Sequence, residues 1–252
     1  MRSNSRRAWV LVSLVLLLVS LGLTLAQSSP PTPQLPPVQP TGRGPAATTR
    51  SVVVIDPAHG GSESGAVLNP TILEKDVTLA LARRLRQDLT SRGILVEILR
   101  EGDVNLSTDD RAAKANAENT ALYLCLHASS DVGGIKVFSA LLPQIEVGKG
   151  PFLDWNTAQS KSLENSRSVE QQLAAAIQKA GLRARSLIAP LRPLNNIAAP
   201  AIAVEVGPTA ADVSQLMSND YQQTISSAVA NGVAGLWVLQ ANPSAPGSGA
   251  PK

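Results

Sequence analysis

The sequence predicts an α/β fold, in which a mainly parallel, twisted sheet carries helices on both faces within a single domain of residues 51–240. Two observations predict this class. Continuous apolar runs rich in valine and isoleucine are typical of strands that are buried on both faces. Between these runs, apolar residues recur every three or four positions, which indicates amphipathic helices. A sheet of this kind binds its ligands at the carboxyl ends of its strands.

The first half of the domain opens with a strand at 52–55, an unbroken β-branched run that ends at Asp56 and Pro57. Helical spacing of apolar residues predicts a helix over 77–89, and Gly93 marks its end. A strand, a short helix and another strand follow, at 94–99, 108–116 and 121–126.

The second half continues the alternation of strands and helices. A strand is predicted at 135–140, and a helix over 169–177 is closed by Gly181. The run at 201–204 is wholly apolar and predicts a late buried strand, and a final helix covers 225–236. This order favours strands that are parallel and joined by helical crossovers.

Residues 1–26 have the pattern of an export signal. Three arginines precede an apolar run at 8–26, and this run ends in small residues. We expect either a signal peptide that is cleaved at the end of the run or an N-terminal anchor that keeps residues 8–26 as a membrane tether. Both alternatives place the rest of the chain outside the cytoplasm, in the periplasm or cell envelope.

Residues 27–50 are expected to form a solvated tether, because seven of these 24 residues are proline and no apolar periodicity is visible. Residues 241–252 are expected to form a disordered tail. The segment 51–240 between them is the part of the chain that we expect to fold.

Charge and cysteine content give no support to one class of protein and exclude another. The net charge of +3 comes from the three arginines of residues 1–26, since without them 22 − 3 = 19 basic side chains face 19 acidic ones. A neutral domain gives no support to nucleic-acid binding, which needs a clustered basic surface. The single cysteine, Cys125, excludes an intrachain disulfide, and we expect it to be a buried, inert thiol.

Four side chains carry the candidate chemistry. His59 and His127 each follow a predicted strand, and they are the only histidines of the chain. Glu74 stands where a loop enters a helix, and Glu205 ends an apolar strand. The structural alternatives are core histidines, a carboxylate in the first turn of a helix and a salt-bridged acid. Together, two imidazoles and a carboxylate form a common catalytic zinc site, and a second carboxylate can act as its general base.

The glycine-rich segment at 60–65 does not match other catalytic motifs. It does not read G-x-G-x-x-G, and no Gly-Lys-Ser/Thr follows it, so it is not a phosphate-binding loop. Its central residue is Glu63 rather than serine, which also excludes the nucleophile elbow of serine hydrolases.

Several separated motifs carry a family resemblance. They are VVVIDPAHGG at 52–61, EKD at 74–76, LSTDDRAAKAN at 106–116, LYLCLHASS at 122–130, GGIKVFSA at 133–140 and APAIAVEVG at 199–207. In this order they resemble the zinc-dependent N-acetylmuramoyl-L-alanine amidases of the amidase-3 type, which are bacterial cell-wall hydrolases.

The resemblance implies that Zn²⁺ is the cofactor, that His59, Glu74 and His127 are its ligands, and that Glu205 is catalytic. The implied reaction is hydrolysis of the amide between N-acetylmuramic acid and L-alanine in peptidoglycan. We expect a monomer, and whether a protein activator is needed stays open.

Three further motif residues have expected supporting roles. Asp56 is expected either to orient a metal ligand without binding the metal itself or to shape the turn at the end of its strand. Arg111 and Asn116 are expected to fix the fold rather than to contact substrate.

The chain departs from the family pattern at Ala58, Ser129 and Pro208, where glycine, asparagine and phenylalanine are usual. These departures motivate an alternative, a catalytically impaired amidase-like domain that binds peptidoglycan or a partner. A zinc peptidase or deacetylase with another substrate is a further alternative. The segment 141–165 matches poorly and is expected to be a plain loop, with a surface excursion or a regulatory insert as alternatives.

Overall fold

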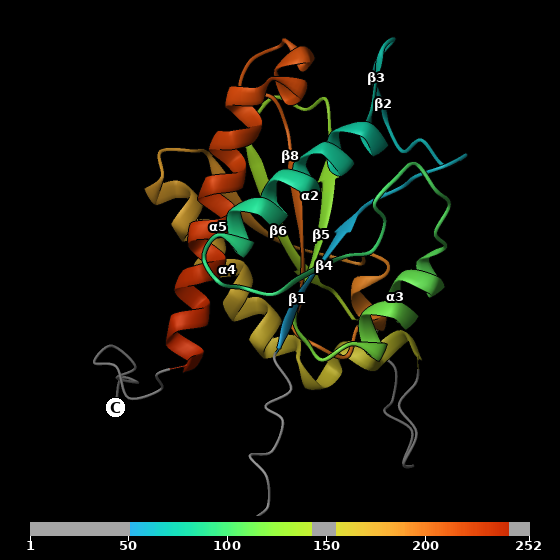
Figure 1. The fold of residues 1–252 in the computed structure, drawn as a ribbon, viewed down its shortest axis with the longest axis vertical. Coiled ribbons are helices and arrows are strands. Elements are labelled where there is room, and N and C mark those ends of the chain that lie inside the picture. The colour runs from blue at the N-terminus through green and yellow to red at the C-terminus, as the bar shows by residue number, and fades with distance from the viewer. Residues whose placement is uncertain (1–50, 143–154, 242–252) are drawn as a thin grey trace, which may run out of the picture. The chain divides into compact units, whose positions relative to one another are not determined.

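The computed structural model describes residues 51–142 and 155–241, which are built around a six-stranded sheet (Figure 1). The strand order is β4-β1-β5-β8-β6-β7, with the bounds Val96–Ile98, Val52–Pro57, Thr120–Ala128, Ala201–Val206, Ile135–Ala140 and Ala184–Ala189. The first four strands of this order are parallel, whereas β6 runs antiparallel to β8 and parallel to β7. The prediction of a mainly parallel sheet is therefore confirmed, with one reversal at the border of β8 and β6.

Four α-helices and a small hairpin complete the described fold. The helices are α2 (Glu74–Thr90), α3 (Thr108–Ala117), α4 (Leu163–Lys179) and α5 (Asn219–Ala241). The hairpin consists of β2 (Val67–Asn69) and β3 (Ile72–Leu73), and short 3₁₀ segments lie at Trp155–Lys161, Leu194–Asn196 and Val213–Met217.

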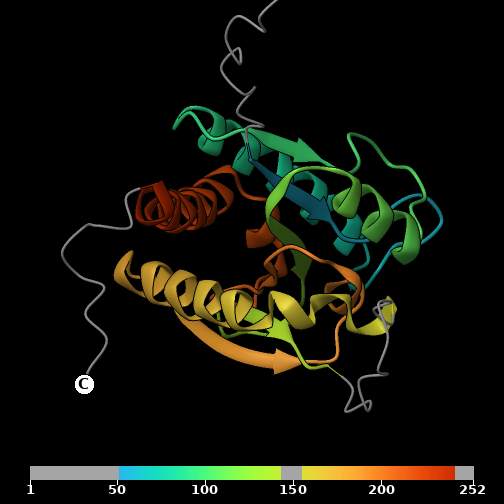
Figure 2. The ribbon, with the colours of Figure 1, turned by 90° about the horizontal axis from the view of Figure 1, so that it is seen from below.

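The helices cover both faces of the sheet because alternate strand residues point to opposite sides. On one face, Ile55, Leu124 and Val204 share a core with α2, α4 and α5. On the other face, Tyr123 and Ala203 share a second core with α3 and the 3₁₀ segment Leu194–Asn196. Figure 2 shows α3 and α5 on opposite sides of the strands, which confirms the predicted layers.

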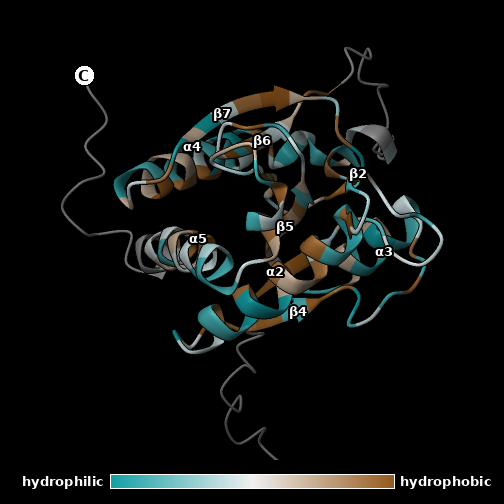
Figure 3. Cartoon of the chain, turned by 90° about the horizontal axis from the view of Figure 1, so that it is seen from above, coloured by the Kyte–Doolittle hydropathy of each residue, from teal (hydrophilic) through white to brown (hydrophobic). Residues whose placement is uncertain are grey.

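Hydropathy follows these layers. In Figure 3 the strands are largely brown, whereas the helices carry both brown and teal residues. This is the pattern expected when a helix buries only one stripe of its surface against the sheet. The central strand β5 is buried from Leu122 to Leu126, in agreement with the apolar run in the sequence.

The predicted helices and strands are all present in the described residues, but two features were not predicted. The β2–β3 hairpin is too short to show a period of two in the sequence. Strand β7 was missed because it is an edge strand whose residues from Arg185 to Ile188 are exposed. Its sequence, ARSLIA, therefore shows no continuous apolar run.

The expectation of a plain loop over 141–165 is wrong for the part that the structure describes. The 3₁₀ segment Trp155–Lys161 lies within it, and α4 begins at Leu163. Gln159 holds this segment in a defined conformation. Its side-chain amide donates hydrogen bonds to the carbonyls of Ile197 and Ala199 at 2.9 and 2.7 Å. These long-range contacts cannot be read from the local sequence.

The expected signal or anchor and the expected tether lie outside the described residues, and so does the expected tail from residue 242 onward. Ala241, the predicted first residue of the tail, is instead the last residue of α5. Within 51–142 and 155–241, we find no helix that combines the length and the apolar character needed to cross a membrane.

Candidate metal centre

The two histidines and Glu74 come from three different elements that meet at one end of the sheet. His59 lies two residues beyond the end of β1, and His127 is the penultimate residue of β5. Glu74 is the first residue of α2. Because β1 and β5 are parallel neighbours, their carboxyl ends lie side by side, which brings the two imidazoles together.

The donor atoms of these residues form a compact cluster. His127 Nδ1 lies 2.8 Å from Glu74 Oε1, and His59 Nε2 lies 3.2 Å from Glu74 Oε2. The two imidazole rings meet edge to face, with centroids 5.5 Å apart. One donor atom from each residue lies within 4.8 Å of the other two, so the three residues can hold one metal ion. The imidazoles stay accessible, with side chains 21% and 26% exposed.

The Glu74 carboxylate is held in its ionised form. It is nearly buried, and it accepts hydrogen bonds from the backbone N–H groups of Ala66 and Ala128 at 2.9 and 3.2 Å. Burial alone would raise the pKa of Glu74, but the hydrogen bonds from His127, His59 and Ala66 lower it below its ordinary value. A carboxylate that stays ionised is a ready ligand for a cation.

The hydrogen bond with Glu74 raises the pKa of His59 above its ordinary value of 6.5, although burial opposes this effect. Because a metal ion must displace the proton, the zinc affinity of the metal-free protein should rise with pH through the range in which His59 loses its proton. Competition titrations with a zinc chelator between about pH 6 and pH 8 will measure this dependence. An affinity that does not change with pH would contradict the involvement of His59.

The second nitrogen of His59 is also engaged. Its Nδ1 lies 3.2 Å from Oε1 of Glu63, a carboxylate in the glycine-rich segment that sequence reasoning considered only as a failed motif. Histidines that bind metals commonly donate their other N–H to a carboxylate, which fixes the tautomer and the orientation of the ring. Glu63 is thus a supporting residue that the sequence analysis missed.

The backbone of His59 adopts a left-handed conformation, with φ of 63°. This conformation is rare for a non-glycine residue and must be held in place by other contacts. Arg111 supplies one of them, because its Nη2 donates to the His59 carbonyl at 2.7 Å and its Nη1 to the Pro57 carbonyl at 3.0 Å. Arg111 therefore fixes the loop that carries His59, in agreement with its expected structural role.

Asp56 lies fully buried behind this loop. Its carboxylate forms an ion pair with Arg111 and accepts a hydrogen bond from the Tyr123 hydroxyl. Asp56 therefore orients His59 through Arg111 rather than by direct contact. The side chain of Asn116 bonds to the backbone of Asn196 and Ala198, which ties α3 to the 3₁₀ segment and supports its expected role in the fold.

Because Gly65 has no side chain, it leaves room for the side chains of His59 and Glu74. It has φ of +67°, and a Cβ at this position would lie 2.5 Å from Cδ2 of His59 and 2.7 Å from Oε2 of Glu74. No side chain fits there unless His59 and Glu74 move apart.

Gly65→Ala should therefore weaken zinc binding by about 10-fold or more, which is the usual effect of disturbing the residues that support metal ligands. Gly93→Ala is the matched control, because Gly93 also has a positive φ, of +78°, but has open space around its Cα. Both variants carry a similar backbone strain. Zinc affinity measured by calorimetry should fall only in Gly65→Ala, and equal affinities would show that the close contact is unimportant.

Glu205 lies beside this cluster rather than within it. It is in register with His127 on the neighbouring strand β5, and both side chains point to the face of the sheet that carries α3. Its Oε1 lies 2.7 Å from Nζ of Lys136, and its side chain is 23% exposed. The salt-bridged alternative for Glu205 was named from the sequence, but its partner Lys136 was not identified.

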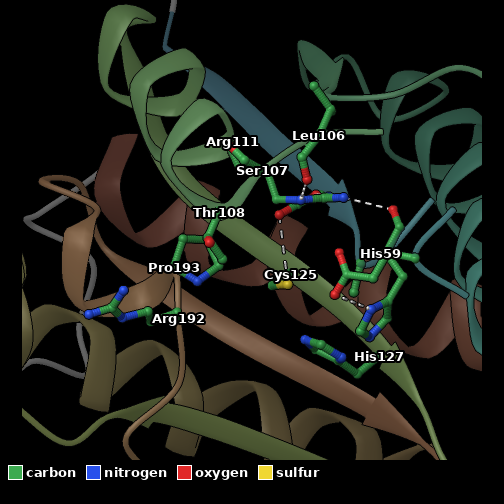
Figure 4. Close-up of a pocket in the computed structure, with 12 residues that line it drawn as sticks. His59, Leu106, Ser107, Thr108, Arg111, Cys125, His127, Arg192 and Pro193 are labelled. Carbon is green, nitrogen blue, oxygen red and sulfur yellow. Dashed lines mark hydrogen bonds and ion pairs between the residues drawn. The ribbon is translucent and has the colours of Figure 1, made fainter. Parts of the chain in front are cut away.

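A pocket of about 240 Å³ reaches both histidines (Figure 4). Besides these histidines, its lining includes Ser107 and Thr108 at the start of α3, and Arg192 and Pro193 from the segment after β7. Cys125 also lines the pocket but is buried, and burial raises the pKa of its thiol. The expectation of a buried thiol is confirmed, and a raised pKa disfavours the reactive thiolate.

Comparison with known proteins decides the family. The model of the N-acetylmuramoyl-L-alanine amidase family matches residues 53–235. The chain belongs to this family. The match spans β1 to α5 and includes all four candidate residues of the amidase site.

Individual relatives are similar to parts of this chain. The chain is 38% identical to the N-acetylmuramoyl-L-alanine amidase AmiC of Escherichia coli O6:H1 over 101 residues, which are 38% of this chain and 24% of that protein. It is 39% identical to the endolysin of Bacillus phage SPP1 over 84 residues, which are 33% of this chain and 31% of that protein. The matches thus span less than a third of either relative.

The fold agrees with a solved amidase structure. The N-acetylmuramoyl-L-alanine amidase of Clostridium difficile 630 superposes with a TM-score of 0.60 and 22% identity, covering 79% of this chain and all of that one. At this identity the comparison supports the fold, a mostly parallel sheet flanked by helices, and the family model carries the assignment.

Proposed function

We propose that this chain is a zinc-dependent amidase that hydrolyses the amide between N-acetylmuramic acid and L-alanine in peptidoglycan. The observation that carries the proposal is the cluster of His59, Glu74 and His127, whose donor atoms lie within 4.8 Å of one another beside an accessible pocket. Glu205 stands next to this cluster on the neighbouring strand. The chain belongs to a family that is described by this activity.

The donor set fits zinc. Two imidazole nitrogens and one carboxylate oxygen are the ligands of many catalytic zinc sites, which keep a fourth position for water or substrate. We assign His59, Glu74 and His127 as the residues that would hold the ion. When bound, zinc polarises the amide carbonyl and lowers the pKa of a water molecule towards neutrality.

Glu205 is proposed as the general base. A carboxylate can take the proton of the attacking water and then deliver it to the nitrogen of the leaving L-alanine. Its position in the sheet suits this role, because the register with His127 keeps the side chain at the carboxyl end of β8, beside the metal ligands. Lys136 holds one carboxylate oxygen at 2.7 Å, which leaves the other oxygen for proton transfer.

Export is part of the same proposal. Peptidoglycan lies outside the cytoplasmic membrane, so an enzyme that cleaves it must leave the cytoplasm. The three arginines and the apolar run of residues 1–26 support export to the periplasm or cell envelope. We propose that the chain acts as a monomer on this substrate, with residues 8–26 either removed or kept as a membrane tether.

Digestion of purified peptidoglycan sacculi by the zinc-loaded full chain, followed by mass spectrometry of the soluble products, tests the function. We expect free stem peptides with an N-terminal alanine and glycan strands without peptides. Release of acetate would instead identify a deacetylase, and cuts within the stem would identify a peptidase. Binding to sacculi without any release would favour the catalytically impaired alternative.

A further inference from the structure

We propose that Lys136 is a positioning residue for the reaction: it fixes the Glu205 carboxylate in place for proton transfer and is itself anchored by Asp131. This inference rests on the proposed amidase function. It adds a specific dependence of the rate on a side chain that is neither a metal ligand nor a general base.

The contacts define a short chain of alternating charges. Lys136 Nζ lies 2.7 Å from Glu205 Oε1 and 3.1 Å from Asp131 Oδ2. Within the part of the chain that the structure describes, Lys136 is the only hydrogen-bond partner of the Glu205 carboxylate. One ammonium therefore determines where this carboxylate points.

The antiparallel pairing of β6 with β8 places Lys136 in this position. Lys136 of β6 is in register with Glu205 of β8, which is in register with His127 of β5. Register partners on adjacent strands point to the same face and lie about 5 Å apart. His127, Glu205 and Lys136 thus form a row across the sheet, with the carboxylate between the imidazole and the ammonium.

The backbone of the loop that carries Asp131 is fixed relative to Glu205, although the Asp131 side chain itself is 72% exposed. The loop after β5 is tied to the segment after β8, since the N–H of Ser129 donates to the Val206 carbonyl at 3.0 Å and the N–H of Gly207 to the Gly134 carbonyl at 2.9 Å. A Cβ on Gly207 would lie only 2.3 Å from the carbonyl oxygen of Asp131. This close approach keeps the Asp131 loop packed against the strand that carries Glu205.

The Lys136–Glu205 ion pair is less exposed than an ordinary surface ion pair. A free glutamate side chain samples many rotamers, and misplacing a catalytic group by about 1 Å can cost 10²-fold in rate. The Lys136–Glu205 pair is partly buried, with side chains 29% and 23% exposed. The Arg167–Glu164 pair on α4 is more open, at 36% and 86%, and contacts of that kind contribute little.

The test compares Lys136→Met, Lys136→Arg and the control Arg167→Met in the zinc-loaded full chain. We expect Lys136→Met to lower kcat by about 10- to 100-fold with little change in KM, because binding of substrate does not require the pinned carboxylate. Lys136→Arg should recover most of the rate, because it keeps the positive charge and hydrogen-bond donors. Arg167→Met should behave like the wild type.

Zinc content and thermal unfolding are measured on the same samples, and both should stay at the wild-type level in Lys136→Met. In the metal-free protein, NMR of the lysine ammonium groups should show one protected Lys136 signal, and this protection should decrease in Glu205→Gln, in which the contact is weakened. If the wild type is active and Lys136→Met has the same kcat, the positioning role of Lys136 is wrong but the proposed function stands. A wild type that holds zinc but releases no stem peptides overturns the proposed function. If Lys136→Met loses zinc or unfolds, the role of Lys136 is structural, and the positioning role is wrong.

Discussion

Glu205→Gln should lower kcat by about 10²- to 10⁴-fold, the usual contribution of a general base, while zinc content stays unchanged. The amide has nearly the size of the carboxylate but cannot accept the proton of the attacking water. Lys136 can still donate to the amide oxygen of the variant, so the contact at 2.7 Å is weakened rather than removed. Release of stem peptides from sacculi, together with metal analysis, measures both quantities.

Glu97→Gln provides the matched control for this prediction, because Glu97 is also a strand carboxylate but lies exposed on β4, away from the histidines. It should retain full activity. If Glu205→Gln still released stem peptides at the wild-type rate, another group would have to be the base. If it lost zinc, Glu205 would belong to the ligands instead.

His127→Ala should abolish zinc binding at micromolar metal, a loss larger than the 10- to 100-fold that is typical for residues that only support a ligand. The substitution removes one of the two imidazoles and leaves Glu74 Oε1 without its partner at 2.8 Å. Since the hydrogen bond from His127 is the largest influence that lowers the pKa of Glu74, this pKa should rise in the variant. Metal analysis and calorimetry of the purified protein measure the loss.

Ser129→Ala is the control for the loss of zinc. Ser129 stands two residues beyond His127, and its hydroxyl is buried without a hydrogen-bond partner among the described residues. Removing this hydroxyl should leave the zinc content unchanged. A His127→Ala protein that keeps a full zinc site would refute the assignment of His127 as a ligand.

Much of the fold could be predicted from the sequence because its signals are local. The β-branched run of β1 and the helical spacing of α2 each depend on neighbouring residues only. The placement of His59 and His127 together follows from one further rule, that parallel strands end at the same edge. That the two histidines lie close together could thus be predicted from the sequence.

The surroundings of the site could not be predicted in the same way. Lys136 reaches Glu205 only because β6 joins the sheet antiparallel to β8, and this pairing of residues 69 positions apart leaves no local pattern. The contact of Arg111 with the His59 carbonyl spans 52 positions and depends on how α3 docks. Such contacts are set by tertiary packing, and the spacing of apolar residues in the sequence carries no information about them.

The position of Arg111 links α3 to the loop that carries His59, one of the proposed metal ligands. A single guanidinium on this helix binds the Asp56 carboxylate and the backbone carbonyls of Pro57 and His59. A metal ion that binds only the folded site raises the free energy of unfolding of every segment that must be folded for binding. At an ion concentration of 100 times the dissociation constant, this stabilisation is about 2.7 kcal/mol. Amide protons of α3, which supplies no ligand, should therefore exchange more slowly with solvent deuterium once the ion is added.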